Sequence, residues 1–222
     1  MVEIIPAVLV GSLEEMRAKL ARVRGVAGTV QIDLCDGFFV PTRTWPFNTS
    51  DKKSFDDMAR GVTGLPYWED FDFEIDLMVQ SPEKVLPHWI KAGIARAVFH
   101  LESRHDVGEL RRAADGIELG VALNIATPLA RLDPYLDQVD YVQFMGIATI
   151  GKQGEPFDER VLETIRTFKS AHPDVVIQVD GAVDAVSAPQ LIAAGATRLV
   201  SGSYIMNSDD PREAIASLDA SH

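Results

Sequence analysis

The stretch VVIQVDGAVDAVSAPQLIAAGATRLVSGS, residues 175–203, contains two strand patterns separated by one helix pattern. An apolar run at 175–180 is followed by a helical pattern at 185–194, which ends at Gly195, a common residue just after a helix. A second apolar run follows at 198–201. Strands that alternate with helices of this length indicate βαβ units, in which neighbouring strands are parallel.

The same alternation extends along the whole chain. Strand patterns are expected at 4–9, 28–34, 71–78, 95–101, 118–124, 141–145, 175–180 and 198–201. Ser12, with Glu15 three residues later, forms a capping box that predicts the start of the first helix. Eight such units in 222 residues favour an α/β fold made of a single (β/α)8 TIM barrel over residues 1–222. An open doubly wound sheet is the alternative, but the single Gly11 after the first strand does not form its Gly-x-Gly-x-x-Gly turn.

Composition excludes several classes of protein. The formal net charge is −12 and no basic stripe is present, so nucleic-acid binding and association with anionic membranes are not expected. No apolar run reaches the ~18–20 residues that cross a bilayer, and the start of the chain lacks the basic region of a secretory signal. Cys35 is the one cysteine, so an internal disulfide is impossible and the cytoplasm is the expected compartment.

The connection at about 42–70 is longer than a usual link between strand and helix, whose non-helical part has about 2–6 residues. It contains a possible short helix near 54–60. A plain surface insertion is one interpretation. A lid, or a contact between copies in a homo-oligomer, is the other, and the sequence leaves both open.

Two aspartates mark the expected active site, which in parallel barrels lies at the carboxyl ends of the strands. Asp33 and Asp180 each end a largely apolar strand, and the two strands are expected on roughly opposite sides of the barrel. Two opposed carboxylates suit removal of a proton from one face of a planar intermediate and its return to the other face, which inverts the carbon. The alternative is that each aspartate caps the following helix or accepts a backbone N–H.

Glycine-containing turns follow the seventh and eighth strands, where barrels often bind phosphate through backbone N–H groups. A glycine-containing loop after the sixth strand is a candidate flap, and two methionines at strand ends are candidates for an apolar floor under the substrate. The residues expected to bind the phosphate and the rest of a substrate are Gly181, Ala182, Gly202, Ser203, Gly151, Gly154, Met78 and Met145.

Several motifs resemble those of the ribulose-phosphate 3-epimerases, metal-dependent (β/α)8 enzymes of the ribulose-phosphate-binding type in the pentose phosphate pathway. The resemblance runs from about residue 4 to 206, and its motifs are DLCDGFFVP at 33–41, DLM at 76–78, HLE at 100–102, GVALNIATP at 120–128, VDG at 179–181 and GS at 202–203. It implies inversion of C3 of a ketose phosphate, D-ribulose 5-phosphate to D-xylulose 5-phosphate, through an enediolate. Asp33 and Asp180 are the acid and base that the resemblance implies.

The resemblance departs from the family pattern at the metal site. Where the family has a His-x-Asp, a further histidine and an aspartate, this chain has Gln31, Asp33, Asp76 and Asp180 as the candidate ligands. An all-oxygen set favours Mg²⁺, Mn²⁺ or Ca²⁺ over Zn²⁺, and ligation by Gln31 is left open. If no ion binds, at least one of the three crowded aspartates should hold a proton near neutral pH.

Smaller departures surround these positions. Ala7, Cys35 and Ala182 stand where the family has serine, methionine and glycine, and TIGKQG at 149–154 replaces the usual Pro-Gly-Phe-Gly-Gly-Gln loop. Cys35 is expected to be a small packing residue rather than a nucleophile. Lys152 is expected to be a solvated loop lysine, although it could pair with a phosphate.

Other functions remain open. An epimerase acting on a different phosphosugar is one, and a non-catalytic sugar-phosphate binder that has lost its metal site is another. His100 and Glu102 form either a structural or a catalytic pair. Related decarboxylases and hexulose-phosphate synthases carry Asp-x-Lys-x-x-Asp on the second strand, and Cys35 and Phe38 at the corresponding positions exclude that chemistry.

Overall fold

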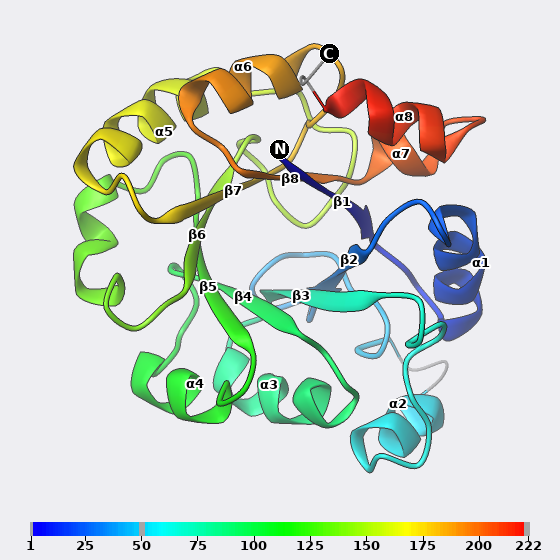
Figure 1. The fold of residues 1–222 in the computed structure, drawn as a ribbon. Helices are drawn as coiled ribbons and strands as arrows, with labels where there is room; N and C mark the ends of the chain where they lie inside the picture. Colours follow the sequence, from blue (N-terminus) through cyan, green and yellow to red (C-terminus); the bar gives the residue numbers. More distant parts are fainter. Residues whose placement is uncertain (1, 49–51, 220–222) are drawn as a thin grey trace.

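The computed structural model describes residues 2–48 and 52–219. Over these residues eight parallel strands follow one another round a closed barrel, in which β8 pairs with β1 (Figure 1). The strands are β1 (Glu3–Val8), β2 (Thr29–Cys35), β3 (Asp72–Met78), β4 (Arg96–His100), β5 (Glu118–Leu123), β6 (Tyr141–Met145), β7 (Val176–Asp180) and β8 (Arg198–Ser201). The predicted (β/α)8 barrel is confirmed, and the open doubly wound sheet is excluded.

Helices surround the barrel on its outer side (Figure 1). They are α1 (Leu13–Val23), α2 (Lys52–Ala59), α3 (Pro82–Lys91), α4 (Val107–Ala113), α5 (Arg160–Ala171), α6 (Ser187–Ala194), α7 (Ser203–Met206) and α8 (Pro211–Leu218), with short 3₁₀ turns η1 (Leu129–Arg131) and η2 (Asp133–Tyr135). None of these helices is both long and apolar enough to pass through a bilayer.

The main apolar core lies between the strands and the helices. In α5, the buried residues Val161, Leu162, Ile165 and Phe168 recur at helical spacing and form one face. The Phe168 ring meets Phe144 of β6 edge-on, with ring centroids 5.3 Å apart. Burial of such faces holds each helix against the barrel, because removing apolar surface from water is the main favourable contribution to folding.

The start of α1 shows how local sequence fixes an element. The Ser12 Oγ accepts the backbone N–H of Glu15 at 3.1 Å, as the capping box predicts. The Glu15 carboxylate accepts the N–H of Gly11 at 2.7 Å, one residue beyond the position that the box predicts. Two backbone donors at this helix end are therefore satisfied by side chains of the first turn.

The long connection between β2 and β3 contributes α2 to the outer layer, where α2 lies next to α3 (Figure 1). Trp45 is fully buried, and its ring meets Phe55 of α2 and Trp89 of α3 edge-on, with centroids 5.7 and 5.8 Å apart. The expected helix near 54–60 is thus found slightly earlier in the chain. Contact between copies through this connection stays a prediction.

The interior of the barrel is unusually polar. Gln31, Glu74, Gln143 and Gln178 point inward and are fully buried, and we call them the polar column. The Gln178 Nε2 donates to Glu74 Oε1 at 2.5 Å and to Gln143 Oε1 at 2.8 Å. The Tyr141 hydroxyl donates to Glu74 Oε2 at 3.1 Å. These bonds satisfy groups that would otherwise be costly to bury.

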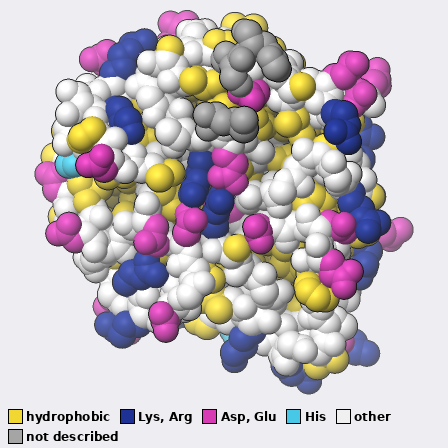
Figure 2. All heavy atoms as spheres, viewed as in Figure 1, with side chains coloured by type: hydrophobic (Ala, Val, Ile, Leu, Met, Phe, Trp, Pro, Cys, Tyr) yellow, Lys and Arg dark blue, Asp and Glu magenta, His cyan; other side chains and the backbone are white. Residues whose placement is uncertain are grey.

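An ion-pair network covers the amino-terminal end of the barrel. Arg96 Nη1 lies 3.0 Å from Glu3 Oε1, and Arg198 Nη2 lies 2.9 Å from Glu118 Oε2. The Arg198 guanidinium also lies over the ring of Tyr141, 5.1 Å from its centroid. In Figure 2, basic and acidic side chains lie together near the middle of the face in view. The end of the barrel opposite the expected site is therefore filled by charged pairs.

Candidate active site

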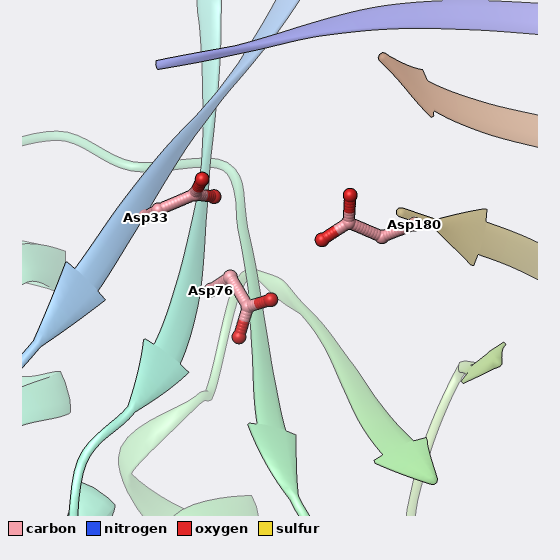
Figure 3. A group of neighbouring side chains, drawn as sticks. All are labelled: Asp33, Asp76 and Asp180. Carbon is pink, nitrogen blue, oxygen red and sulfur yellow. The ribbon is translucent and has the colours of Figure 1, made fainter. Parts of the chain in front are cut away.

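Three aspartates meet at the carboxyl end of the barrel. Asp33 of β2, Asp76 of β3 and Asp180 of β7 each offer a carboxylate oxygen, and these oxygens lie within 4.8 Å of one another. Asp33 and Asp76 are register partners on adjacent strands, and Asp180 approaches them from across the barrel (Figure 3). β2 and β7 are separated by β1 and β8, so the two strands are closer round the barrel than the expected opposite placement.

Gln31 links two of these carboxylates. Its amide nitrogen donates to Asp33 Oδ1 at 2.9 Å and to Asp180 Oδ2 at 3.3 Å. Its carbonyl oxygen is directed the other way and accepts a bond from Gln178 Nε2 at 3.5 Å. Gln31 therefore presents a donor to the aspartates, and its amide would have to turn over before its oxygen could bind a metal ion.

Asp76 is held by hydrogen bonds on both oxygens. His100 Nε2 lies 3.1 Å from Asp76 Oδ1, and Gln143 Nε2 donates to Asp76 Oδ2 at 3.1 Å. Behind His100, Glu102 Oε2 lies 4.0 Å from the ring Nδ1. The other oxygen of Glu102 accepts the hydroxyl of Thr127 at 2.5 Å. His100 of the HLE motif thus helps to fix the orientation of Asp76, whereas Glu102 makes its hydrogen bonds to Asn124 and Thr127.

A cavity opens above the aspartates at the carboxyl end. Asp33 and Asp180 lie in its wall, together with Lys152, Gln153 and Glu155 of the loop after β6. The substrate-binding residues expected from sequence also line it, namely Gly181, Ala182, Gly202, Ser203, Gly151, Gly154, Met78 and Met145. The structure therefore brings these side chains and turns to a single place.

Comparison with known proteins gives the family. The model of the ribulose-phosphate 3 epimerase family matches residues 3–206. The chain belongs to this family. A ribulose-phosphate 3-epimerase of Bacillus subtilis (strain 168) is 30% identical over the full length of both chains. The chloroplastic ribulose-5-phosphate-3-epimerase of Arabidopsis thaliana is 33% identical over 86% of this chain and 66% of its own length. The resemblance inferred from the motifs is thereby confirmed.

Solved structures agree on the fold of this epimerase-family chain. A 3-hexulose-6-phosphate synthase from Salmonella typhimurium superposes with a TM-score of 0.68 at 14% identity, covering 97% of this chain and 96% of its own. An orotidine 5'-phosphate decarboxylase from Pyrococcus horikoshii OT3 has a TM-score of 0.65 at 16% identity, covering 97% of this chain and 96% of its own. At these identities the likeness shows the barrel fold alone.

Burial and repulsion between carboxylates raise the pKa values of two of the three aspartates, which together we call the triad. Burial, with the charge of Asp76, raises the pKa of Asp33 to about 8. Burial, with the charges of Asp33 and Asp76, raises the pKa of Asp180 well above its ordinary value. Burial opposes the charged form of His100, but the Asp76 charge and hydrogen bond outweigh it and raise the pKa of His100. Asp33 and Asp180 therefore resist ionising together near neutral pH unless a positive charge lies beside them.

The donor set of the triad fits a divalent cation. Carboxylate oxygens are the ligands preferred by hard ions such as Mg²⁺, Mn²⁺ and Ca²⁺. Three of them lie within 4.8 Å of one another, and a cation there would neutralise negative charge that is otherwise buried. Asp33, Asp76 and Asp180 are the residues of this epimerase-family chain that could hold such an ion.

The turn after β7 has an uncommon backbone. Gly181 has φ +105°, and a Cβ there would lie 2.7 Å from Ile147 Cγ1, so the position requires glycine on two counts. Ala182 follows with φ +53°, in the left-handed region that costs a residue with a Cβ about 1–2 kcal/mol. Ala182 is therefore held in a conformation that glycine adopts more readily.

Two buried glutamines support the three aspartates from below and were not predicted from the sequence. Gln143 and Gln178 were not singled out, yet Gln143 holds Asp76 and Gln178 holds both Gln31 and Gln143. A signal was available, because each residue of the polar column precedes an inward site residue by two positions. Because side chains alternate along a strand, residues two positions apart lie on the same face.

Proposed function

We propose that the chain inverts C3 of a ketose phosphate and interconverts D-ribulose 5-phosphate and D-xylulose 5-phosphate. Membership of the ribulose-phosphate 3-epimerase family supports an epimerase of ribulose phosphate. The observation that carries the mechanism is that Asp33 and Asp180 extend from separate strands into one cavity (Figure 3). Two acid/base groups that reach one molecule from different sides are what inversion at carbon requires.

In this mechanism, one aspartate acts as a carboxylate and takes the proton from C3, which leaves an enediolate. The other acts as a carboxylic acid and delivers its proton to the opposite face of the same carbon. The two residues exchange roles when the reaction runs backward. In the metal-free site, burial and repulsion raise the pKa values of Asp33 and Asp180, so that the pair readily keeps one proton near neutral pH.

Asp33, Asp76 and Asp180 would hold the divalent ion, with Gln31 as a further ligand only if its amide turned over. A bound ion would supply electrostatic stabilisation of negative charge on the substrate oxygens. His100 and Gln143 act on the same site by holding Asp76 in one orientation. We propose Mg²⁺, Mn²⁺ or Ca²⁺ rather than Zn²⁺, because every candidate ligand atom is oxygen.

The substrate phosphate would bind at the turns after β7 and β8. Gly181-Ala182 and Gly202-Ser203 line the cavity beside Asp180, and turns at this place in barrels commonly bind phosphate. Gly151 and Gly154 of the loop after β6 would complete this wall. Met78 and Met145 would form the apolar floor under the carbon chain.

The test is exchange of solvent deuterium into C3 of D-ribulose 5-phosphate, followed by proton NMR with each divalent ion in turn. Wild-type protein should incorporate deuterium and form D-xylulose 5-phosphate. Asp33→Asn and Asp180→Asn should abolish epimerisation with the fold retained, whereas the exposed Asp209→Asn should leave the rate unchanged. No exchange at high enzyme concentration excludes this substrate, and a normal rate in Asp33→Asn or Asp180→Asn excludes the assigned acid and base.

A different phosphosugar is the second candidate, favoured by the wall that the loop after β6 forms. Lys152 and Glu155 line the cavity there, so charged side chains border the substrate. A panel of ketose phosphates in the same exchange assay separates the two candidates. A non-catalytic binder would bind these compounds without exchange. A cytoplasmic location and a homo-oligomeric state stay predictions.

A further inference from the structure

The loop after β6 places a lysine in the wall of the active-site cavity. Lys152 is the one Lys or Arg among the described residues that line this cavity, whereas Asp33, Asp180 and Glu155 contribute carboxyl groups to it. Its Nζ lies 2.6 Å from Glu155 Oε1. The Lys152 side chain is 57% exposed and the Glu155 side chain only 21% exposed. The lysine is therefore solvated in part, as the sequence suggested, but its charge is held beside the site.

Residues before and after Lys152 in the sequence pack against the mouth of the barrel. Ile150 packs on the small apolar cluster that contains Val40 and Met78. The Gln153 amide lies against Gly202, so closely that a Cβ at Gly202 would collide with it. Lys152 lies between these two contacts, and the loop therefore holds it near the turns proposed to bind phosphate.

A phosphate dianion that enters this cavity meets carboxyl groups, so a nearby cation would favour its binding. The cavity wall already contains carboxyl groups and the whole chain has a formal charge of −12. Backbone N–H groups can bind phosphate but carry only partial charges. Lys152 is the side chain of this cavity wall that can offer a full positive charge among the described residues.

The cavity is small in the free protein. Its volume is about 50 Å³, far below the ~300–1,000 Å³ of ordinary small-molecule sites. Binding of a ketose phosphate is therefore expected to displace part of the wall. The Lys152–Glu155 pair is a suitable part, because an exposed ion pair contributes only about 0–1 kcal/mol and is easily exchanged.

We propose that Lys152 determines specificity for the substrate phosphate, leaving Glu155 and pairing with the phosphate when a ketose phosphate binds. This inference rests on the proposed function for the identity of the substrate. Glu155 acts as a competitor that holds the lysine in the free protein and repels the phosphate. The pair thus sets the affinity for phosphorylated ligands without taking part in proton transfer.

The experiment compares Lys152→Met, Lys152→Arg and Glu155→Gln, with the exposed Lys84→Met of α3 as a control that removes the same charge elsewhere. Binding of inorganic phosphate is measured by phosphorus NMR titration, independently of turnover. Lys152→Met should weaken phosphate binding and raise KM for D-ribulose 5-phosphate about 10-fold, with kcat within about 2-fold. Lys152→Arg should retain most of the affinity, and Lys84→Met should match the wild type.

Glu155→Gln should tighten phosphate binding, and part of that gain should disappear in the Glu155→Gln/Lys152→Met double variant if the glutamate acts through the lysine. Unchanged phosphate affinity and KM in Lys152→Met would overturn the inference, even with an active epimerase. Wild-type protein that binds no inorganic phosphate would also overturn it. Lysine-dependent phosphate binding without deuterium exchange would refute the proposed reaction and leave the role of Lys152 standing.

Discussion

Raising the pH from 5 to 8 in the presence of a chelator should strongly destabilise the folded protein. The pKa of Asp33 is raised to about 8 in the fold, whereas an unfolded aspartate titrates near ~3.9. Between these values the folded chain holds a proton that the unfolded chain has released. The free energy of unfolding therefore falls as the pH rises, by about 1.4 kcal/mol per pH unit. Over this window the loss is about 4 kcal/mol, a large fraction of the ~5–15 kcal/mol that stabilises a typical protein.

Other groups change the slope in known directions. Burial raises the pKa of Glu74 to about 7, and burial with neighbouring charges raises the pKa of Asp180, so both make the fall steeper. The raised pKa of His100 acts in the same direction above ~6.5. Burial lowers the pKa of His105, which opposes the fall in the acidic part of the window. The net slope should remain clearly negative.

Urea unfolding followed by tryptophan fluorescence at several pH values measures this slope. Asp33→Asn should flatten the profile, while Asp209→Asn should run parallel to the wild type. Adding Mn²⁺ at pH 8 should restore stability, because the ion binds the ionised triad of the folded state. A stability that stays constant or increases from pH 5 to 8 without metal would refute the charge assignment of the triad.

Three further outcomes are expected. Ala182→Gly should stabilise the fold by about 0.5–1 kcal/mol in urea unfolding, since relief of the left-handed strain exceeds the added freedom of the unfolded chain, and a loss of stability would contradict this. Trp45→Ala should cost about 3–5 kcal/mol because its ring is fully buried between Phe55 and Trp89, and a loss below ~1 kcal/mol would mean that the connection is poorly packed. Asp76→Asn should weaken Mn²⁺ binding, measured by electron paramagnetic resonance, at least about 10-fold, and equal affinity would remove Asp76 from the ligand set.

The strand period made much of the candidate site predictable. Asp33, Asp76 and Asp180 each lie at an inward position near the end of a strand, and in a closed parallel barrel such positions converge. The alternation of strand and helix patterns predicts the fold, and the positions of the three aspartates at strand ends then predict their cluster. The glycine turns that line the cavity follow in the same way.

The hydrogen-bond partners were not predictable. Gln31 binds Asp180, 149 residues away, and Gln143 binds Asp76, 67 residues away. A strand pattern gives the side on which a residue lies, but the rotamer and partner depend on strands across the barrel. The direction of the Gln31 amide is an example, because its nitrogen donates to Asp180 on a strand far away in the sequence as well as to Asp33.

Ion pairs among Glu3, Arg96, Glu118 and Arg198 fill the amino-terminal end of the barrel, whereas Asp33 and Asp180 line the cavity at its carboxyl end. In the proposed reaction, water that exchanges the proton of Asp33 or Asp180 would enter through the same cavity as the sugar phosphate. The loop after β6 lines this cavity, so substitutions in the loop should change the rate of solvent isotope exchange and the rate of product release together.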